Sequence, residues 1–311
     1  MDELLIIGGS AAGTAAAIYA ARRNLKVRII SGDLGGEVAK SGEVENYPGF
    51  VHTTGIELAD LFEKHLRAQN NLVIETGVQV TKLEHDKHDS SFKIIATKDG
   101  VPATYQARAV IVATGVHPRL LGVPGEEEYK NKGVSYCTVC DGPLYRNKRV
   151  VTVGGGNSAL ESIIMLAGLP GTTVSLLTKN PTMKGEAILI DKLKALANVT
   201  VITNADTTAI TGDQFVTGLE YTNKETGQKE SLQVDGIFVH IGMIPNSDYI
   251  GIAEKNQFGE IHVNAYQETN IPGLFAAGDV TDHPFKQIAI ATGQGVTAAL
   301  QAARYLDNLA N

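Results

Sequence analysis

The chain has 311 residues, with 27 Lys and Arg against 34 Asp and Glu, a formal net charge of -7 and 43% hydrophobic residues. This length exceeds the roughly 250 to 300 residues at which a single core stops growing, so two domains are expected. The composition excludes a disordered chain, and an acidic balance without clustered Lys or Arg argues against binding to nucleic acid. No basic leader and no long apolar run is present, so we expect a cytoplasmic protein that does not bind a membrane.

The pattern of apolar segments predicts two β-α-β units. The first has a strand at 4–7, a helix at 11–23 and a strand at 26–30; the second has a strand at 149–153, a helix at 158–167 and a strand at 173–177. Their glycine turns lie 154 − 8 = 146 residues apart, so each can begin its own nucleotide-binding fold. Also predicted are a helix at 54–69, strands near 109–115, 236–240 and 273–276, and a closing helix at about 292–306.

The first glycine turn, Gly8-Gly9-Ser10-Ala11-Ala12-Gly13, follows a predicted strand and opens a helix. Gly8 permits a tight turn, the small residues Ser10, Ala11 and Ala12 let a pyrophosphate approach, and Gly13 lets the helix pack closely on the strand. Free N–H groups at the helix start would bind phosphate. The turn therefore predicts a dinucleotide site, with a tight turn that binds nothing as the alternative. Ser10 replaces the second glycine of the usual fingerprint.

The second glycine turn, residues 154–159, has the G-x-G-x-x-A form of the same fingerprint. A second nucleotide site implies a second cofactor. An Asp or Glu about 20 residues further on would favour NAD, whereas basic residues there accommodate a 2′-phosphate. The segment 177–184 contains Lys179 and Lys184 and no acid, which favours NADPH weakly, because these lysines are equally consistent with solvated loop charges.

The only two cysteines are Cys137 and Cys140. A disulfide framework needs more cysteines and a structural zinc site needs four ligands, so this Cys-x-x-Cys pair favours redox chemistry and no metal is expected. The alternative is a pair of unrelated buried thiols. Thiol–disulfide exchange also needs a proton donor. Asp141, which follows Cys140, is placed to be that general acid, with a simple turn residue as the alternative.

Six stretches together resemble the low-molecular-weight thioredoxin reductases and, in the C-terminal half, the reductase portion of alkyl hydroperoxide reductase flavoproteins. They are residues 43–49, 137–143, 154–159, 242–246, 275–280 and 286–288. Ala-Ala-Gly-Asp at 276–279 and Ala-Thr-Gly at 113–115 match FAD-dependent pyridine-nucleotide disulfide oxidoreductases more broadly, where the Asp lies on the flavin ribityl chain.

The resemblance implies an α/β fold with two Rossmann-like dinucleotide-binding domains. The NAD(P)-binding domain, residues 117–243, would carry the Cys pair and would be inserted into an FAD-binding domain formed by residues 1–116 and 244–311. It also implies a homodimer that passes electrons from NAD(P)H through FAD to the disulfide of a thioredoxin-like or glutaredoxin-like protein. Cys140 would face the flavin and Cys137 would attack the partner.

The residues expected to bind each cofactor follow from the turns and the resemblance. For FAD they are Gly8, Ser10, Ala11, Ala12, Gly13, Gly36, Glu37, Asn46, Thr114, Gly115, Gly278, Asp279, Lys286, Gln287 and Ile288. For NAD(P) they are Gly154, Gly156, Asn157, Ser158, Ala159, Lys179, Lys184 and Gly242.

Two departures from the family pattern leave alternatives open. Thioredoxin reductases usually have His-Arg-Arg and a further Arg where this chain has Thr178-Lys179-Asn180 and Lys184, so NADH is the alternative donor. Glu37 replaces a common Gln, for which we have no physical account.

The competing functions are a flavin-dependent dithiol oxidase, a ferredoxin-linked thioredoxin reductase and a non-enzymatic flavin redox sensor. Because residue 1 leads directly into the first strand, we expect the electron acceptor to be a separate protein.

Overall fold

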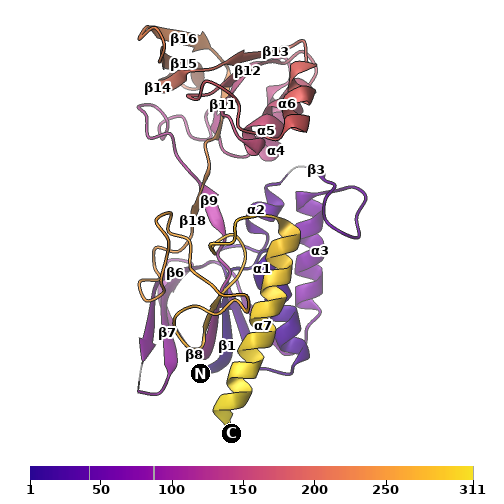
Figure 1. The fold of residues 1–311 in the computed structure, drawn as a ribbon, viewed down its shortest axis with the longest axis vertical. Coiled ribbons are helices and arrows are strands. Elements are labelled where there is room, and N and C mark those ends of the chain that lie inside the picture. The colour runs from indigo at the N-terminus through magenta and orange to yellow at the C-terminus, as the bar shows by residue number, and fades with distance from the viewer. Residues whose placement is uncertain (42, 87, 311) are drawn as a thin grey trace. The chain divides into compact units, whose positions relative to one another are not determined.

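The computed structural model describes residues 1–41, 43–86 and 88–310, and the side chains of Glu43, Cys140 and Ala310 lie outside the described part. The chain folds as two compact units. One is formed by Met1–His117 together with Ile244–Asn311, and the other by Pro118–Met243. The second unit is therefore an insertion in the sequence of the first, and the chain passes between them twice. Figure 1 labels most elements of both.

The unit formed by residues 1–117 and 244–311 is built on a seven-stranded sheet in the order β5-β2-β1-β8-β7-β6, with β19 beside β8. Parallel pairing joins β5, β2, β1, β8 and β19, whereas β6 and β7 are antiparallel. The strands are β1 (Asp2–Ile7), β2 (Val27–Ile30), β5 (Leu72–Glu75), β6 (Val78–Asp86), β7 (Ser91–Lys98), β8 (Val101–Val112) and β19 (Leu274–Ala276), and a separate pair is formed by β3 (Glu43–Val44) and β4 (Thr53–Thr54).

Both faces of this sheet are buried, which is why residues 4–7 of β1 are a continuous apolar run. Leu4 and Ile6 pack with the helices in one core, and Leu5 and Ile7 pack in a second core on the other face. The helices are α1 (Ala11–Arg22), α2 (Gly36–Ala39), α3 (Gly55–Arg67) and α7 (Ile288–Ala310). Both α3 and α7 contact α1, and in Figure 1 the yellow α7 overlaps α1 in the view.

The unit formed by residues 118–243 has a five-stranded, wholly parallel sheet in the order β10-β17-β11-β12-β13 and a three-stranded antiparallel sheet, β14-β15-β16. Its strands are β10 (Val134–Ser135), β11 (Arg149–Gly154), β12 (Thr173–Leu177), β13 (Val199–Ile202), β14 (Ala205–Gly212), β15 (Val216–Asn223), β16 (Lys229–Gln233) and β17 (Gly236–His240). The helical segments are α4 (Thr138–Asp141), η1 (Gly142–Tyr145), α5 (Asn157–Ala167) and α6 (Ala187–Lys194). Short strands β9 (Val116–Pro118) and β18 (Met243–Pro245) pair where the chain crosses between units.

The α/β fold with two Rossmann-like units is confirmed, and the two predicted β-α-β units are present. The predicted strands 173–177 and 236–240 agree with β12 and β17. The closing helix differs, because α7 begins at Ile288 rather than near residue 292. The first turns of α7 were not predicted, because Gly293 and Gly295 have low helix propensity. Gly295 is required there, since a Cβ on it would lie 2.1 Å from the Ala12 carbonyl oxygen of α1.

None of the helices in the described ranges combines the length and the apolar character needed to cross a bilayer.

Candidate functional site

The first glycine turn connects β1 to α1 at the carboxyl end of the parallel strands, where ligands bind in open α/β sheets. Gly8 has a φ of +111°, and a Cβ on it would lie 2.2 Å from the Ala113 carbonyl oxygen. A Cβ on Gly13 would lie 1.8 Å from the Gly8 carbonyl oxygen, so α1 starts in close contact with the turn. The Ser10 hydroxyl donates to the Gly35 carbonyl oxygen at 2.5 Å, and Ser10 thereby ties the turn to the segment before α2.

A cavity of about 560 Å³ lies over this turn. Its lining combines the turn with the loops that follow β2 and β8 and with the segment between β19 and α7. The sequence-predicted residues that line it are Gly8, Ser10, Ala11, Ala12, Gly36, Glu37, Thr114, Gly115, Gly278, Asp279, Gln287 and Ile288. Segments up to 280 residues apart in the sequence therefore meet at one cavity.

Among the charged residues that line this cavity, Asp279 has a carboxyl group whose pKa is shifted by burial. Burial raises the pKa of its carboxyl above the ordinary value; Lys286 opposes that shift and Glu37 adds to it. Within the described residues, the Asp279 carboxylate makes no hydrogen bond or ion pair. A partly buried carboxylate in this condition lacks the partners that such groups normally have, so donors from a ligand would satisfy it.

Three predicted flavin residues lie outside the cavity lining. Gly13 contributes through the packing of α1. The Asn46 amide donates to the Gln287 side-chain oxygen at 3.2 Å, so Asn46 supports a residue that does line the cavity. The Lys286 ammonium donates to the Thr281 carbonyl oxygen at 2.5 Å and forms an ion pair with Glu260 at 2.9 Å.

Sequence reasoning missed several lining residues. Ser31 and Asp33 follow β2: the Ser31 hydroxyl accepts a hydrogen bond from the Gly9 N–H at 3.0 Å, and the Asp33 carboxylate accepts one from the Gly36 N–H at 2.9 Å. The sequence did contain a signal for Asp33, because an acidic residue about 20 residues after the glycine turn is typical of dinucleotide-binding folds. The remaining missed residues are Ile7, Gly9, Gly32, Val38, Lys40, Val78, Gln79, Val80, Ala113, Val116, His117, Asn246, Asp248, Tyr249, Ala277 and Ala291.

The second glycine turn connects β11 to α5 in the unit of residues 118–243. Gly154 has a φ of +152°, and a Cβ on it would lie 2.1 Å from the His240 carbonyl oxygen of β17. A Cβ on Gly156 would meet nothing within 4 Å, so the backbone is open at this position. Ala159 is fully buried beneath the turn. This geometry leaves a free approach to the N-terminus of α5.

The segment after β12 folds against this turn. Thr178 is buried, and its hydroxyl oxygen lies 2.7 Å from where a Cβ on Gly155 would be. The Lys184 N–H donates to the Gly155 carbonyl oxygen at 2.7 Å, whereas the side chains of Lys179 and Lys184 are exposed. Asn157 and Glu186 exchange two hydrogen bonds of 2.8 Å. Predicted residues 154–159 and Lys184 thus lie together, while Gly242 follows β17, where its carbonyl accepts from the Arg119 N–H.

The predicted redox pair spans the start of α4. Cys137 is disulfide-bonded, and its N–H donates to the Ser135 hydroxyl oxygen at 3.0 Å. The side chain of Cys140 lies outside the described residues. The Asp141 N–H donates to the Cys137 carbonyl oxygen at 3.1 Å, which closes the turn between them. In the described part of the chain, His, Cys, Asp and Glu side chains form no group of three that could hold a metal ion.

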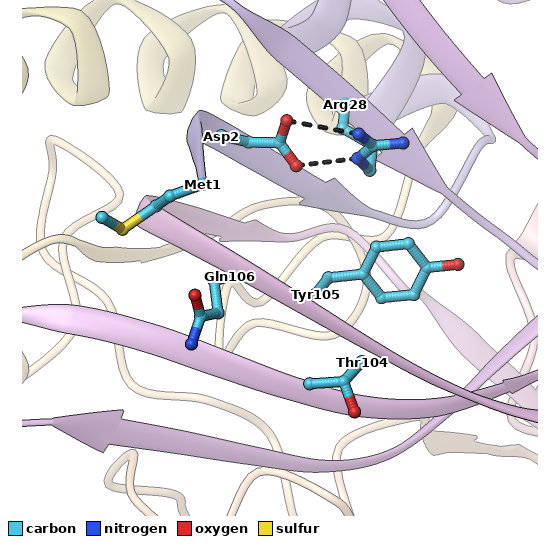
Figure 2. Close-up of a pocket in the computed structure, with 6 residues that line it drawn as sticks. All are labelled: Met1, Asp2, Arg28, Thr104, Tyr105 and Gln106. Carbon is cyan, nitrogen blue, oxygen red and sulfur yellow. Dashed lines mark hydrogen bonds and ion pairs between the residues drawn. The ribbon is translucent and has the colours of Figure 1, made fainter.

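A smaller cavity of about 290 Å³ lies at the amino end of β1, opposite the first glycine turn, and contains none of the predicted residues. Figure 2 shows Asp2 paired with Arg28 there. Arg28 also forms an ion pair with Glu75, and its guanidinium carbon lies 5.8 Å from the centroid of the Tyr105 ring. The cation is therefore balanced by two carboxylates, and the network joins β1, β2 and β5.

Known proteins resemble the chain over nearly its whole length. Residues 2–295 match the family model described as pyridine nucleotide-disulphide oxidoreductase. An alkyl hydroperoxide reductase component of Escherichia coli is 43% identical over 306 residues, covering 98% of this chain and 58% of that protein. A protein named NADH dehydrogenase from Ferdinandcohnia aciditolerans is 41% identical over 305 residues, covering 98% of this chain and 57% of that protein. The chain thus spans less than two thirds of these curated relatives.

Solved thioredoxin reductases share the fold over full length. The enzyme of Lactococcus lactis matches with a TM-score of 0.91 at 31% identity, covering 99% of this chain and 100% of that one. The enzyme of T. acidophilum matches with a TM-score of 0.88 at 38% identity, covering 99% of both chains. With both glycine turns and the Cys-x-x-Cys motif inside the matched range, this chain belongs to the pyridine nucleotide-disulphide oxidoreductase family.

Proposed function

We propose that this chain is a flavin-dependent disulfide reductase, which takes electrons from a pyridine nucleotide and delivers them through Cys137 and Cys140 to the disulfide of a thioredoxin-like or glutaredoxin-like protein. The observation that carries the proposal is a disulfide at Cys137 in the same unit as a second dinucleotide turn. Because a chain with only two cysteines has no disulfide framework, redox exchange is the better explanation of that bond.

FAD is the group that we assign to the cavity of residues 1–117 and 244–311. The cavity volume is within the range of roughly 300 to 1,000 Å³ common for small-molecule sites. The start of α1 provides N–H groups for a pyrophosphate, and the Asp279 carboxylate would accept hydrogen bonds from the ribityl hydroxyls. A flavin bound there supplies two-electron chemistry between a reduced nicotinamide and a disulfide.

The pyridine nucleotide is assigned to the turn at residues 154–159, where an open backbone at Gly156 and the start of α5 suit a second pyrophosphate. We favour NADPH, because Lys179 and Lys184 offer positive charge and the segment 177–184 contains no carboxylate. Both side chains are exposed, so water and salt screen their charges and only modest discrimination against NADH is expected.

The thiol chemistry follows from the Cys pair. In each turnover the Cys137 thiolate attacks the partner disulfide, forms a mixed disulfide and releases one partner thiol; Cys140 then displaces the second thiol and restores the Cys137–Cys140 disulfide. Asp141 is the group that we assign to protonate the departing thiolate. One NAD(P)H and one proton are consumed for each partner disulfide that is reduced, so atoms and electrons balance.

The test is an anaerobic titration of the purified flavoprotein with NADH or NADPH, followed by oxidised thioredoxin. The proposal expects a stoichiometric amount of nucleotide to bleach the flavin and thioredoxin to restore its colour. Oxygen uptake driven by a small dithiol without nucleotide would identify the dithiol oxidase instead. Bleaching by reduced ferredoxin alone would identify the ferredoxin-linked enzyme. Reduction without turnover on any disulfide protein would identify the redox sensor.

A further inference from the structure

A buried chain of hydroxyl groups lies behind the redox turn in the unit of residues 118–243. The Thr138 hydroxyl oxygen lies 2.6 Å from the Ser162 hydroxyl oxygen and 2.8 Å from His240 Nε2. The Ser162 hydroxyl oxygen lies 3.2 Å from that of Thr152. Thr138, Thr152 and Ser162 are all buried. Side chains from α4, α5, β11 and β17 therefore converge on one polar chain.

This chain satisfies its members without a buried charge. Burial lowers the pKa of His240 to about 4, so the imidazole is neutral at pH 7. A neutral imidazole has one donor and one acceptor nitrogen, and each hydroxyl can both donate and accept, so the bonds can run in a consistent direction. Removing one member would take a hydrogen bond from each of its direct neighbours in the chain, which is costly for a buried polar group. The arrangement is therefore a firm anchor for Thr138.

Thr138 directly follows the disulfide-bonded Cys137 and begins α4. The Cys137 N–H is held by the Ser135 hydroxyl, and the Cys137 carbonyl accepts from the Asp141 N–H. The backbone of Cys137 is thus fixed by its own hydrogen bonds on one side and by the anchored Thr138 on the other. A movement of residues 137–141 would therefore either break the hydrogen bonds of the Thr138 hydroxyl or leave Thr138 in place.

We infer that His240 is a positioning residue for the redox turn: acting through Thr138, it holds the Cys137 backbone in the arrangement that favours the disulfide. The inference deepens the proposed function and rests on it. A disulfide requires its two Cβ atoms to lie about 3.8 Å apart, and reduction removes that restraint. An anchor at Thr138 opposes the relaxation that would follow. Loss of the anchor should therefore stabilise the dithiol relative to the disulfide.

The main chain of His240 has a separate task. Its carbonyl oxygen lies against Gly154, and His240 pairs with Gly154 in the parallel ladder between β11 and β17. A substitution of the His240 side chain leaves this backbone contact in place. Effects on the disulfide can thus be separated from effects on the second glycine turn.

The experiment equilibrates the FAD-loaded protein with mixtures of reduced and oxidised dithiothreitol, traps thiols by alkylation and counts them by mass spectrometry. In the reaction measured, the protein disulfide breaks to two thiols while dithiothreitol closes to its cyclic disulfide. We expect Thr138→Val and His240→Leu each to shift the equilibrium about tenfold toward the dithiol, equivalent to about 30 mV for this two-electron couple. His240→Gln, which can still bond to Thr138, should stay close to wild type.

Thr172→Val is the matched control, because Thr172 is buried in the same unit and its hydroxyl donates to the Tyr145 carbonyl oxygen rather than to the chain. It should shift the equilibrium less than twofold. Equal values for Thr138→Val, His240→Leu and Thr172→Val, or a shift toward the disulfide, would overturn the inference. FAD content and thermal melting show whether a variant has lost its fold. If one has, the comparison of His240→Gln with wild type is used instead, and a tenfold shift of the dithiol–disulfide equilibrium in His240→Gln would also contradict the inference. Failure of wild type to turn over with thioredoxin would instead refute the proposed function.

Discussion

The two glycine turns of this chain solve the same packing problem with different residues. Each follows a central parallel strand, and each places its first glycine where a Cβ would collide with a carbonyl oxygen of the neighbouring strand or the residue just after it, Ala113 O for Gly8 and His240 O for Gly154. They differ at the sixth position, which is Gly13 in the first turn and Ala159 in the second.

That difference follows from how closely each helix approaches its own turn. A Cβ on Gly13 would lie 1.8 Å from the Gly8 carbonyl oxygen, a distance that no real side chain tolerates. In the second turn the Ala159 methyl group is accommodated and fully buried. The first turn is therefore more tightly constrained, and we expect it to be the less tolerant of substitution.

The largest effect is expected for Gly13→Ala, compared with Ala159→Gly as its counterpart. The added methyl must displace the Gly8 backbone, so Gly13→Ala should lose bound flavin and about 1–3 kcal/mol or more of unfolding free energy. Ala159→Gly should keep its flavin and lose about 1–2 kcal/mol, through a lost methyl group and a helical glycine. Flavin absorbance per protein and thermal melting measure both. Full flavin content in Gly13→Ala would show that the first turn is not the tighter of the two.

Cys137→Ser separates the two electron transfers that we propose, one from NAD(P)H to the flavin and one through the Cys pair to thioredoxin. Hydride transfer uses no sulfur, so the variant should still have its flavin reduced by NAD(P)H. Reduction of thioredoxin should fall by at least about 10³-fold, because a serine hydroxyl cannot form the mixed disulfide. Stopped-flow absorbance and steady-state turnover give the two values. Retention of thioredoxin turnover would exclude Cys137 as the attacking thiol.

Asp279→Ala tests whether the first turn acts together with a distant segment. The carboxylate makes no hydrogen bond or ion pair within the described protein, so the main loss in this variant is its hydrogen bonds to the ligand. Hydrogen bonds to charged groups contribute about 1.5–3 kcal/mol, so FAD affinity should fall about ten- to hundredfold. Asp279→Asn should fall between wild type and Asp279→Ala. Binding of FAD to the apoprotein is measured by fluorescence, and an unchanged Kd would remove Asp279 from the flavin site.

The smallest effect is expected at the second turn. Lys179 is exposed, and a single screened charge contributes about 1 kcal/mol or less, so Lys179→Glu should move the ratio of kcat/KM for NADPH over NADH toward NADH only about fivefold. Lys194→Glu, an exposed charge change on α6, is the control and should leave the ratio unchanged. Equal ratios in both variants and in wild type would mean that neither lysine takes part in the choice of nucleotide.

What the sequence predicted well was local. Both turns, strands β12 and β17, and the helix after Thr54 follow from short apolar patterns and glycine turns. In the structure that helix also begins with a capping box formed by Thr54 and Glu57. What it missed depends on contacts between distant segments. Gly295 of α7 packs against the distant Ala12 of α1, and the contact between Thr138 and His240 joins residues 102 positions apart. The hydrophobic periodicity of the sequence does not predict a contact between two such distant residues.

The lining residues after β2 show the same limit. Ser31 and Asp33 reach the first turn only because β2 lies parallel beside β1. Once that pairing is known, the carboxyl ends of both strands must meet at one edge of the sheet. Sequence spacing located the turns, whereas sheet order was needed to complete the cavity around them.

The most direct test of the central claim, that the two turns hold two different dinucleotides, is an experimental structure of the yellow holoprotein soaked with NADP⁺. We predict flavin dinucleotide density against residues 8–13 and Asp279, and nicotinamide dinucleotide density against residues 154–159 with its pyrophosphate at the start of α5. A structure in which NADP⁺ occupies the first turn, or in which saturating NADP⁺ leaves the second turn empty, would contradict the account.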